Sequence, residues 1–353
     1  MKMIYKTFKF RIKDRAYCKR LEEMADTVNL VWNYCNEISY EEYRKSRKFL
    51  SYKNISEKLS DSSQYLNLQA IIIRLVARKH YKRRYITKKS KLNWRSKKRS
   101  LSWIPFNRNC FLFCGKYVRA GGVNLKIWDH REIEGEIKTA NIVKNSKGNW
   151  FVNVVCECPD AIVTSINKSI GIDLGLKNTI TCSDGKVYTS PKPLKKYSIK
   201  LAKAQRAKKK RQTTNIHKKI QNIRKDFNHK ATTEIIKNND RIFVGNVKPE
   251  FLLKKNSIFA KLVTDASWGQ IRTMLAYKAN WLGKVFQPVN EAWSSCTCSV
   301  CHVRNGPSGL SQLDVRNWVC NCCGTTHDRD VNAAINILNF GAGLSSPTLE
   351  SFN

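Results

Sequence analysis

The chain has 353 residues, 42% of them hydrophobic, which is enough to bury more than one core and argues against a disordered tail. It carries 65 Lys and Arg against 27 Asp and Glu, and the formal charge of +38 repels itself unless a polyanion neutralises it. No apolar run of 18 residues and no signal-peptide core occur, which argues against a membrane protein or an exported one. We therefore expect several domains, a nucleic acid as partner, and a cytoplasmic protein that joins the nucleoid when it binds DNA.

The first hundred residues predict a strand followed by helices. Residues 1–15 alternate apolar and basic side chains, as a strand with one buried face does. From Leu21 to Ile38 the apolar residues recur at intervals of three and four, which predicts an amphipathic helix. A second helix is expected around residues 68–76. We therefore predict a helical lobe over residues 16–100.

The next sixty residues return to the strand pattern. Alternation is clearest at 118–127 and 150–158, and the pairs Gly121-Gly122 and Lys147-Gly148 are turn signals. Together with the first strand, these segments predict a β-barrel domain over residues 1–15 and 101–164. The helical lobe is then an insertion in that barrel.

Two basic runs interrupt these patterns. Residues 81–100 contain ten Lys and Arg, including Arg83 and Arg84, with interleaved aromatic residues and no acid. Residues 192–225 contain fourteen Lys and Arg before the next acid. One such run is commonly a solvated loop, but two of them favour a surface that contacts phosphates and stacks bases.

From Ser169 onward, strands alternate with helices, which is typical of an α/β domain with partly parallel strands. We predict this domain over 165–293 and 325–341, with a small insertion at 294–324 and a flexible tail at 342–353. The chain as a whole is expected to be a multidomain α+β protein.

The insertion contains a predicted zinc site. Cys298-x-x-Cys301 and Cys320-x-x-Cys323 are separated by eighteen residues, the spacing at which two thiolate pairs converge on one tetrahedral ion. Four thiolates leave no open position, so the zinc is expected to be structural, with redox use of the pairs as the minor alternative. The nearby Cys296 and Cys322 are interpreted as spectators. The other cysteines of the thirteen are expected to be reduced and without chemistry.

Two carboxylates stand in unusual positions. Asp173 interrupts an apolar strand, Ile170 to Leu174, where an unpaired charge is costly. Asp330 opens the last predicted helix, where capping of the helix is a sufficient explanation by itself. In combination with a third carboxylate, the two would bind the Mg²⁺ or Mn²⁺ ions that hydrolyse phosphodiesters.

These motifs resemble the TnpB (OrfB) proteins, transposon-associated relatives of the compact type V CRISPR effectors. The resemblance is carried by GIDLG at 171–175, RKDFNHK at 224–230, DASWGQIRTMLAYKA at 265–279, the four cysteines, and HDRDVNAAINIL at 327–338. It covers most of the chain. It implies a RuvC/RNase H-like nuclease domain interrupted by the zinc ribbon, behind an N-terminal barrel with an inserted recognition lobe.

The resemblance also implies function. It implies a guide RNA encoded near the gene and a double-stranded DNA target read next to a short motif, with the protein as monomer or dimer on its RNA. Asp173 corresponds to the first catalytic carboxylate and Asp330 to the last. Tyr5, Lys6, Trp32 and Asn33 lie where similar proteins contact nucleic acid. Arg224, Lys225 and His229 either touch the guide–target duplex or pack locally.

The middle carboxylate departs from the family pattern. In the TnpB proteins, a strand like Arg241 to Val244 normally ends in Glu. In this sequence Gly245 occupies that position. We predict that Glu291, after the next strand, supplies the missing carboxylate, because parallel neighbouring strands end on the same rim. Glu250 is nearer in sequence but lies in a Lys-rich loop and ranks lower.

Three functions therefore remain open from the sequence. The first is an RNA-guided DNA endonuclease that uses Asp173, Glu291 and Asp330. The second is a nuclease-dead guided binder that acts as a transcriptional repressor. The third is a transposase or DNA-binding protein without RNA, which the basic runs and the zinc ribbon alone would permit.

Overall fold

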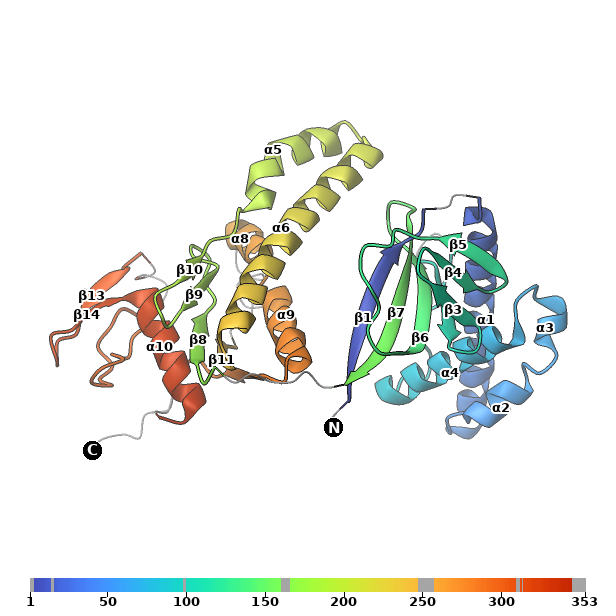
Figure 1. Ribbon diagram of the computed structural model, residues 1–353, viewed down its shortest axis with the longest axis horizontal. Helices are drawn as coiled ribbons and strands as arrows, with labels where there is room; N and C mark the ends of the chain where they lie inside the picture. The colour runs from blue at the N-terminus through green and yellow to red at the C-terminus, as the bar shows by residue number, and fades with distance from the viewer. Residues whose placement is uncertain are drawn as a thin grey trace. The chain divides into compact units, whose positions relative to one another are not determined.

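The computed structural model describes residues 3–13, 16–97, 100–159, 166–246, 257–308, 312 and 314–344, with the backbone alone at 257–259. The chain divides into two compact units, residues 1–159 and 160–353 (Figure 1). No helix in the described ranges is both long and apolar enough to cross a membrane.

The first unit contains two antiparallel sheets. One has four strands in the order β1 (Met3–Arg11), β7 (Trp150–Pro159), β6 (Glu136–Lys144) and β2 (Trp103–Asn107). The other is a meander of β3 (Phe111–Cys114), β4 (Tyr117–Ala120) and β5 (Val123–Lys126). The turn between β4 and β5 uses Gly121 and Gly122, whose φ angles are +60° and +80°. A single bridge, Ile12 to Ile127, joins the ends of β1 and β5.

The predicted barrel is not seen as a closed sheet. In the described part of the first unit, the strands form the two open sheets above, since β2 does not pair with β3. Burial nevertheless alternates along β1, where Ile4, Phe8 and Phe10 face the core. The strand periodicity was therefore a sound guide to the strands, while barrel closure stays a prediction.

Four helices follow β1 along the chain: α1 (Cys18–Ser46), α2 (Tyr52–Glu57), α3 (Ser62–Tyr65) and α4 (Ala70–Thr87). The apolar residues whose spacing predicted α1 form its buried face, including Leu21, Val28 and Val31. The second predicted helix is longer than expected. It extends to Thr87, so the first part of the basic run at 81–100 is helical.

The second unit is built on a five-stranded mixed sheet in the order β10-β9-β8-β11-β12. Strands β8 (Ser169–Asp173), β11 (Arg241–Gly245) and β12 (Val285–Val289) are parallel, with Val244 opposite Ile172 and Gly245 opposite Val289. Strand β9 (Ile180–Cys182) runs antiparallel to both of its neighbours, β8 and β10 (Val187–Tyr188). The predicted parallel pairing of the strands that end at 245 and near 290 is confirmed.

Helices cover both faces of this sheet (Figure 1). Helices α6 (Lys210–Asn238) and α9 (Trp268–Trp281) pack against one face, where their isoleucine and leucine side chains meet those of β8 and β11. Helix α10 (Arg329–Ala342) packs on the other face through Ile337. The remaining elements are α5 (Pro193–Arg206), α8 (Ser257–Ala266), β13 (Asn317–Val319) and β14 (Thr326–Asp328).

Helix α10 approaches the sheet very closely. A Cβ on Gly171 of β8 would lie 2.1 Å from the carbonyl oxygen of Ala334 and 2.6 Å from the amide nitrogen of Leu338. Only glycine at 171 allows the helix backbone to lie directly on the strand. The close approach sets the first turn of α10, with Asp330, beside the end of β8, with Asp173.

Candidate active site and cysteine cluster

Three carboxylates converge at the carboxyl ends of the parallel strands. Asp173 is the last residue of β8, Glu291 follows β12 by two residues, and Asp330 is the second residue of α10. Burial raises the pKa of Asp173 to about 8, and the negative charges of Glu291 and Asp330 add to that rise. The three groups therefore act on one another, and their mutual repulsion favours a bound cation.

Glu291 fills the space beside Gly245. A Cβ on Gly245 would lie 1.8 Å from Oε2 of Glu291 and 2.9 Å from its Cδ. The carboxylate of Glu291 thus occupies the place where a side chain at 245 would begin. This contact explains why residue 245 is a glycine, because a side chain at that position would displace the Glu291 carboxylate. The competing candidate, Glu250, lies outside the described residues.

Asp330 does not cap its own helix. The side chain of Asp328 accepts hydrogen bonds from the backbone N–H groups of Asp330, at 3.0 Å, and Val331, at 2.9 Å, and is the N-cap of α10. The capping explanation of Asp330 is therefore wrong. Its own oxygens accept a hydrogen bond from Asn178 at 3.3 Å and form an ion pair with Arg316 at 2.9 Å.

A cavity of about 620 Å³ opens at this place. Asp173 and Asp330 line it together with cationic residues, among them Lys177, Lys192 and Arg316. Carboxylates surrounded by cations suit a phosphate ester held next to metal-binding oxygens. Reasoning from the sequence missed Asn178 and Arg316, because neither belongs to an acidic motif.

The DASWGQIR segment supports the strand ends. The indole N–H of Trp268 donates to the carbonyl of Gly175 at 3.1 Å, which holds the turn after Asp173. Arg272 donates to the carbonyl of Gly245 at 3.3 Å, at the end of β11. Both contacts come from one face of α9, so this helix fixes the loops that carry the carboxylates.

Asp265 anchors the two basic helices. Its buried carboxylate accepts hydrogen bonds from the N–H groups of Leu194, at 3.0 Å, and Lys195, at 3.1 Å, in the first turn of α5. It also forms an ion pair with Arg224 of α6 at 2.9 Å. For Arg224 the structure thus shows the local pairing that was one of its two interpretations.

The two other predicted residues of α6 differ in exposure. Lys225 is exposed, whereas His229 is half-buried. Burial lowers the pKa of His229, and the charges of Lys278 and Lys225 lower it further. The carbonyl of His229 accepts a hydrogen bond from Lys278 at 2.9 Å. Contact of either residue with a nucleic-acid duplex stays a prediction.

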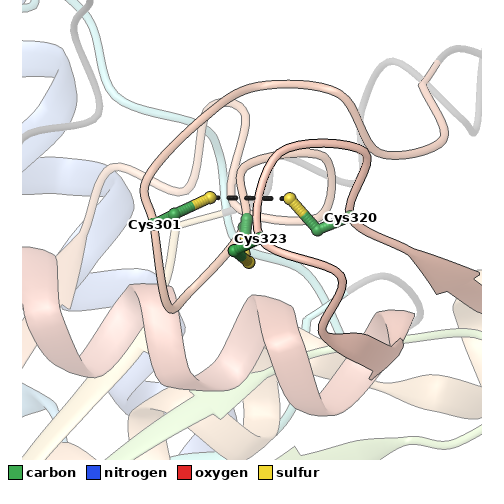
Figure 2. A group of neighbouring side chains, drawn as sticks. Cys301, Cys320 and Cys323 are labelled. Atoms are coloured by element: carbon green, nitrogen blue, oxygen red, sulfur yellow. Dashed lines mark hydrogen bonds between the residues drawn. The ribbon is translucent and has the colours of Figure 1, made fainter.

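The four predicted cysteines form one cluster. Cys298, Cys301, Cys320 and Cys323 bring their sulfur atoms within 4.8 Å of one another, and Figure 2 shows Cys301 and Cys320 pointing toward each other beside Cys323. The Cys298–Cys323 and Cys301–Cys320 sulfur distances are 3.7 and 3.5 Å. A tetrahedral zinc ion with Zn–S bonds near 2.3 Å requires sulfur separations of about 3.8 Å.

No other group of three or more potential metal ligands in the described ranges is as compact as this cluster. Cys296 and Cys322 lie outside it, in agreement with their interpretation as spectators. A hydrogen bond from the backbone N–H of Cys323 lowers the pKa of the Cys320 thiol to about 6, whereas burial raises the pKa of the Cys298 thiol. The donor set and its spacing therefore fit one structural zinc ion.

The cluster has neighbours that the sequence did not reveal. Nε2 of His327 lies 3.0 Å from Sγ of Cys298, and its ring packs on Trp318 with the ring centroids 4.6 Å apart. Asn332 and Asn336 of α10 donate to the carbonyl of Thr297 at 2.8 and 2.7 Å. These hydrogen bonds hold the turn that begins at Cys298 against α10, the helix that carries Asp330.

In the first unit, one predicted contact residue is corrected. Arg84 is buried, donates to the carbonyl of Ser39 at 2.7 Å, and lies over the ring of Phe49 at 4.8 Å. It follows Ala77 and His80 on the buried side of α4, where helical periodicity places it. It is therefore a structural residue, whereas its neighbour Arg83 is exposed.

The other predicted residues of this unit have partners inside the protein. Tyr5 is exposed and donates to Glu157 at 2.8 Å, and Lys6 pairs with Glu134 at 2.6 Å. The indole N–H of Trp32 donates to the carbonyl of Asn93 at 3.3 Å. Asn33 bonds to the backbone of Arg95. None of these contacts tests their interaction with a nucleic acid.

Comparison with known proteins finds relatives in sequence and in fold. Residues 268–337 match the family model described as Cas12f1-like, TNB domain, and residues 153–255 match the one described as Probable transposase, OrfB_IS605. A Streptomyces pristinaespiralis protein named "Putative RNA-guided DNA endonuclease" is 28% identical over 374 residues, which cover 98% of this chain and 92% of the relative. These matches confirm the resemblance to the TnpB (OrfB) proteins.

A second relative and a solved structure are also similar to this chain. The Escherichia coli K12 protein named "Putative RNA-guided DNA endonuclease InsQ" is 30% identical over 240 residues, covering 60% of this chain and 58% of that protein. A chain in the cryo-EM structure of the Cas12f1-sgRNA-target DNA complex matches with a TM-score of 0.63 at 15% identity, over 96% of this chain and 99% of that one. At this identity the match shows a shared mixed α/β fold.

Proposed function

We propose that this protein is an RNA-guided DNA endonuclease that cuts a DNA target next to a short adjacent motif. The names of the two relatives and the fold shared with a chain from a complex of guide RNA and target DNA support this. The net charge of +38 supports a polyanionic partner. In such an enzyme, RNA–DNA pairing reads the sequence, and the protein reads the backbone and the short motif.

The observation that carries the nuclease activity is the carboxylate of Glu291 beside Gly245. It supplies an acidic group at the strand end where a glycine would otherwise leave the site one carboxylate short. A nuclease-dead binder is expected to lose this group without replacement. We therefore prefer the endonuclease to the guided repressor.

We assign the domains on the same basis. Residues 165–293 and 325–341 form a RuvC/RNase H-like nuclease domain, supported by a mixed sheet in which only β9 runs opposite to its neighbours, with acidic groups at the strand ends. Residues 294–324 form the zinc ribbon. Residues 1–15 and 101–164 form the barrel domain around the recognition lobe at 16–100. The guide RNA is encoded near the gene, and the complex acts in the cytoplasm, on the nucleoid, where its DNA target lies.

In this proposal Asp173, Glu291 and Asp330 hold Mg²⁺ or Mn²⁺. When bound, the ions supply an activated water and stabilise the leaving oxygen of the phosphodiester. The protein supplies the rest. Lys177 and Lys192 attract the DNA backbone into the cavity, and Asn178 fixes one oxygen of Asp330 through its hydrogen bond. Arg316 pairs with Asp330 and places its guanidinium in the wall of the same cavity, where it can contact a phosphate oxygen.

The test is cleavage of a matched DNA target by the protein copurified with RNA from the region that flanks its gene. We expect Mg²⁺-dependent cleavage by the wild type, and a loss of at least about a hundredfold in Asp173→Ala and Glu291→Gln. Glu234→Gln is the matched control, because Glu234 is an exposed acid that pairs with Lys186 away from the cluster. Guided binding without cleavage by the wild type would support the repressor, and activity without RNA would support a conventional transposase.

The raised pKa of Asp173 predicts a pH-dependent effect of Mg²⁺ on stability. The pKa is about 8 in the folded protein against 3.8 for an ordinary Asp, so the folded state binds the extra proton between these values. Stability of the metal-free protein therefore falls as pH rises through this window. Mg²⁺ replaces the proton and restores stability. The rise in Tm on adding Mg²⁺ should be larger at pH 8.5 than at pH 6, and Asp173→Asn should remove most of this difference.

A further inference from the structure

A second cavity lies in the first unit, far along the sequence from the carboxylates. It has a volume of about 510 Å³, in the range of sites that take small ligands. Helices α1 and α4 and the segment before β2 form its walls. None of its lining residues is acidic. Its lining includes three indoles and several cations, chiefly Trp32, Trp94, Trp103, Lys79, Arg83 and Lys89.

Two asparagines hold the wall that carries Trp94. Asn36 of α1 donates to the carbonyl of Leu92 at 2.7 Å and accepts from its N–H at 2.9 Å. Asn33, one turn earlier, makes the same pair of bonds to Arg95, both at 2.8 Å. An extended segment is thereby pinned along the helix at both ends, and Trp94 between them is 50% exposed. This wall is ordered before any ligand arrives, which lowers the cost of binding.

The cations of the cavity differ in their availability. Arg95 is committed to the fold, since it donates to Asn29 at 2.9 Å and to the carbonyl of Leu101 at 2.8 Å. No ion pair with a carboxylate is found for Lys79, Arg83 or Lys89 in the parts of the chain that the structure describes. The ammonium of Lys79 lies 5.3 Å from the ring centroid of Trp103. Three positive charges therefore face a space beside aromatic rings without an internal counterion.

This combination fits one kind of ligand. An aromatic face binds a flat base by stacking, and unpaired cations bind the phosphate attached to it. A base inside a duplex is already stacked on both faces and cannot place a face on an indole of this cavity, whereas an unpaired base can. A simple anion would make no use of the indoles.

We propose that this cavity binds one unpaired nucleotide of a single-stranded nucleic acid, with the base on Trp94 and the phosphate near Lys79, Arg83 and Lys89. The proposal rests on the function above in one respect, that a guided nuclease holds both a structured RNA and a displaced DNA strand. Either strand could provide the nucleotide. The site would anchor that strand independently of the pairing that selects the target.

The first test measures binding of 12-nucleotide single-stranded RNA and DNA to the full-length protein by fluorescence anisotropy at fixed salt. Trp94→Ala should weaken binding of at least one of them on the order of tenfold, the expected effect of losing one stacked base. Trp94→Phe should retain most of the affinity. Trp128→Ala is the matched control, because Trp128 is 54% exposed in the same unit and lies outside the cavity.

The second test identifies the strand. The complex of protein, flanking RNA and matched DNA is irradiated with ultraviolet light, and the peptide that contains Trp94 is analysed by mass spectrometry. A ribonucleotide adduct identifies the RNA as the source, and a deoxyribonucleotide adduct identifies the DNA. No adduct, or equal losses of affinity in Trp94→Ala and Trp128→Ala, would overturn the proposal. Neither readout requires cleavage, so a failed nuclease assay leaves this result interpretable.

Discussion

Replacing Gly245 with alanine is expected to reduce target cleavage by about a hundredfold or more, although the change adds only one methyl group and no charge. The new Cβ would lie 1.8 Å from Oε2 of Glu291, a distance that no pair of such atoms tolerates. The neighbour that must move is the carboxylate itself. Cleavage should be measured with the copurified complex, together with Tm to show that the variant folds.

Two further variants make this expectation specific. In a protein that already carries Glu291→Ala, adding Gly245→Ala should reduce cleavage little further, because the carboxylate that it would displace is absent. The effects of the two substitutions on cleavage should therefore be strongly non-additive. The double variant Gly245→Glu with Glu291→Ala returns a carboxylate to the end of β11 and should recover part of the activity. Gly269→Ala serves as the control, since a Cβ on Gly269 meets nothing within 4 Å. Full activity in a folded Gly245→Ala protein would contradict the role of Glu291.

Replacing a cluster cysteine is the second change with a large expected effect. Cys320→Ser should abolish tight binding of one zinc per chain and also suppress cleavage, because the core in the described part of the ribbon is only Cys298, Trp318 and Cys320, with the partly buried Cys301 packed against it. Loss of this fold would release Arg316 from Asp330, at the edge of the active site. Zinc content is measured by elemental analysis and by competition with a chelator.

The matched control for this variant is Cys322→Ser. Cys322 is exposed, lies between two predicted ligands, and stands outside the cluster. Zinc content and cleavage should both be unchanged in it. If Cys320→Ser retained one tightly bound zinc, or if Cys322→Ser lost it, the ligand set would have to be revised.

Several features of the fold could be predicted because they follow from local rules. Strand and helix periodicity placed β1, α1 and the parallel strands β11 and β12. The spacing of the cysteines identified all four members of the cluster. Helix length was less predictable: α4 continues to Thr87, where Arg84 is buried and donates to the carbonyl of Ser39 in α1, although this basic segment resembles a loop in sequence.

The errors have identifiable physical causes. Arg84 belongs to a basic run, but helical phase turns it into the core, where it binds the Ser39 carbonyl. Asp330 is placed where a cap is common, but Asp328 lies two residues earlier and takes that role. In both cases a shift of one or two residues along the helix decides where the side chain points. The composition of the segment does not reveal that direction.

The sequence by itself predicted a polyanionic partner, the cysteine cluster and the acidic residues Asp173 and Asp330, because charge, spacing and a carboxylate in an apolar strand can be read from the order of the residues. Only the tertiary structure decided that the carboxylate of Glu291 stands in the space left by Gly245. The register of two parallel strands joined by some forty residues sets that contact. Such a register depends on the packing of α9 and α10 on the two faces of the sheet, which no local pattern records.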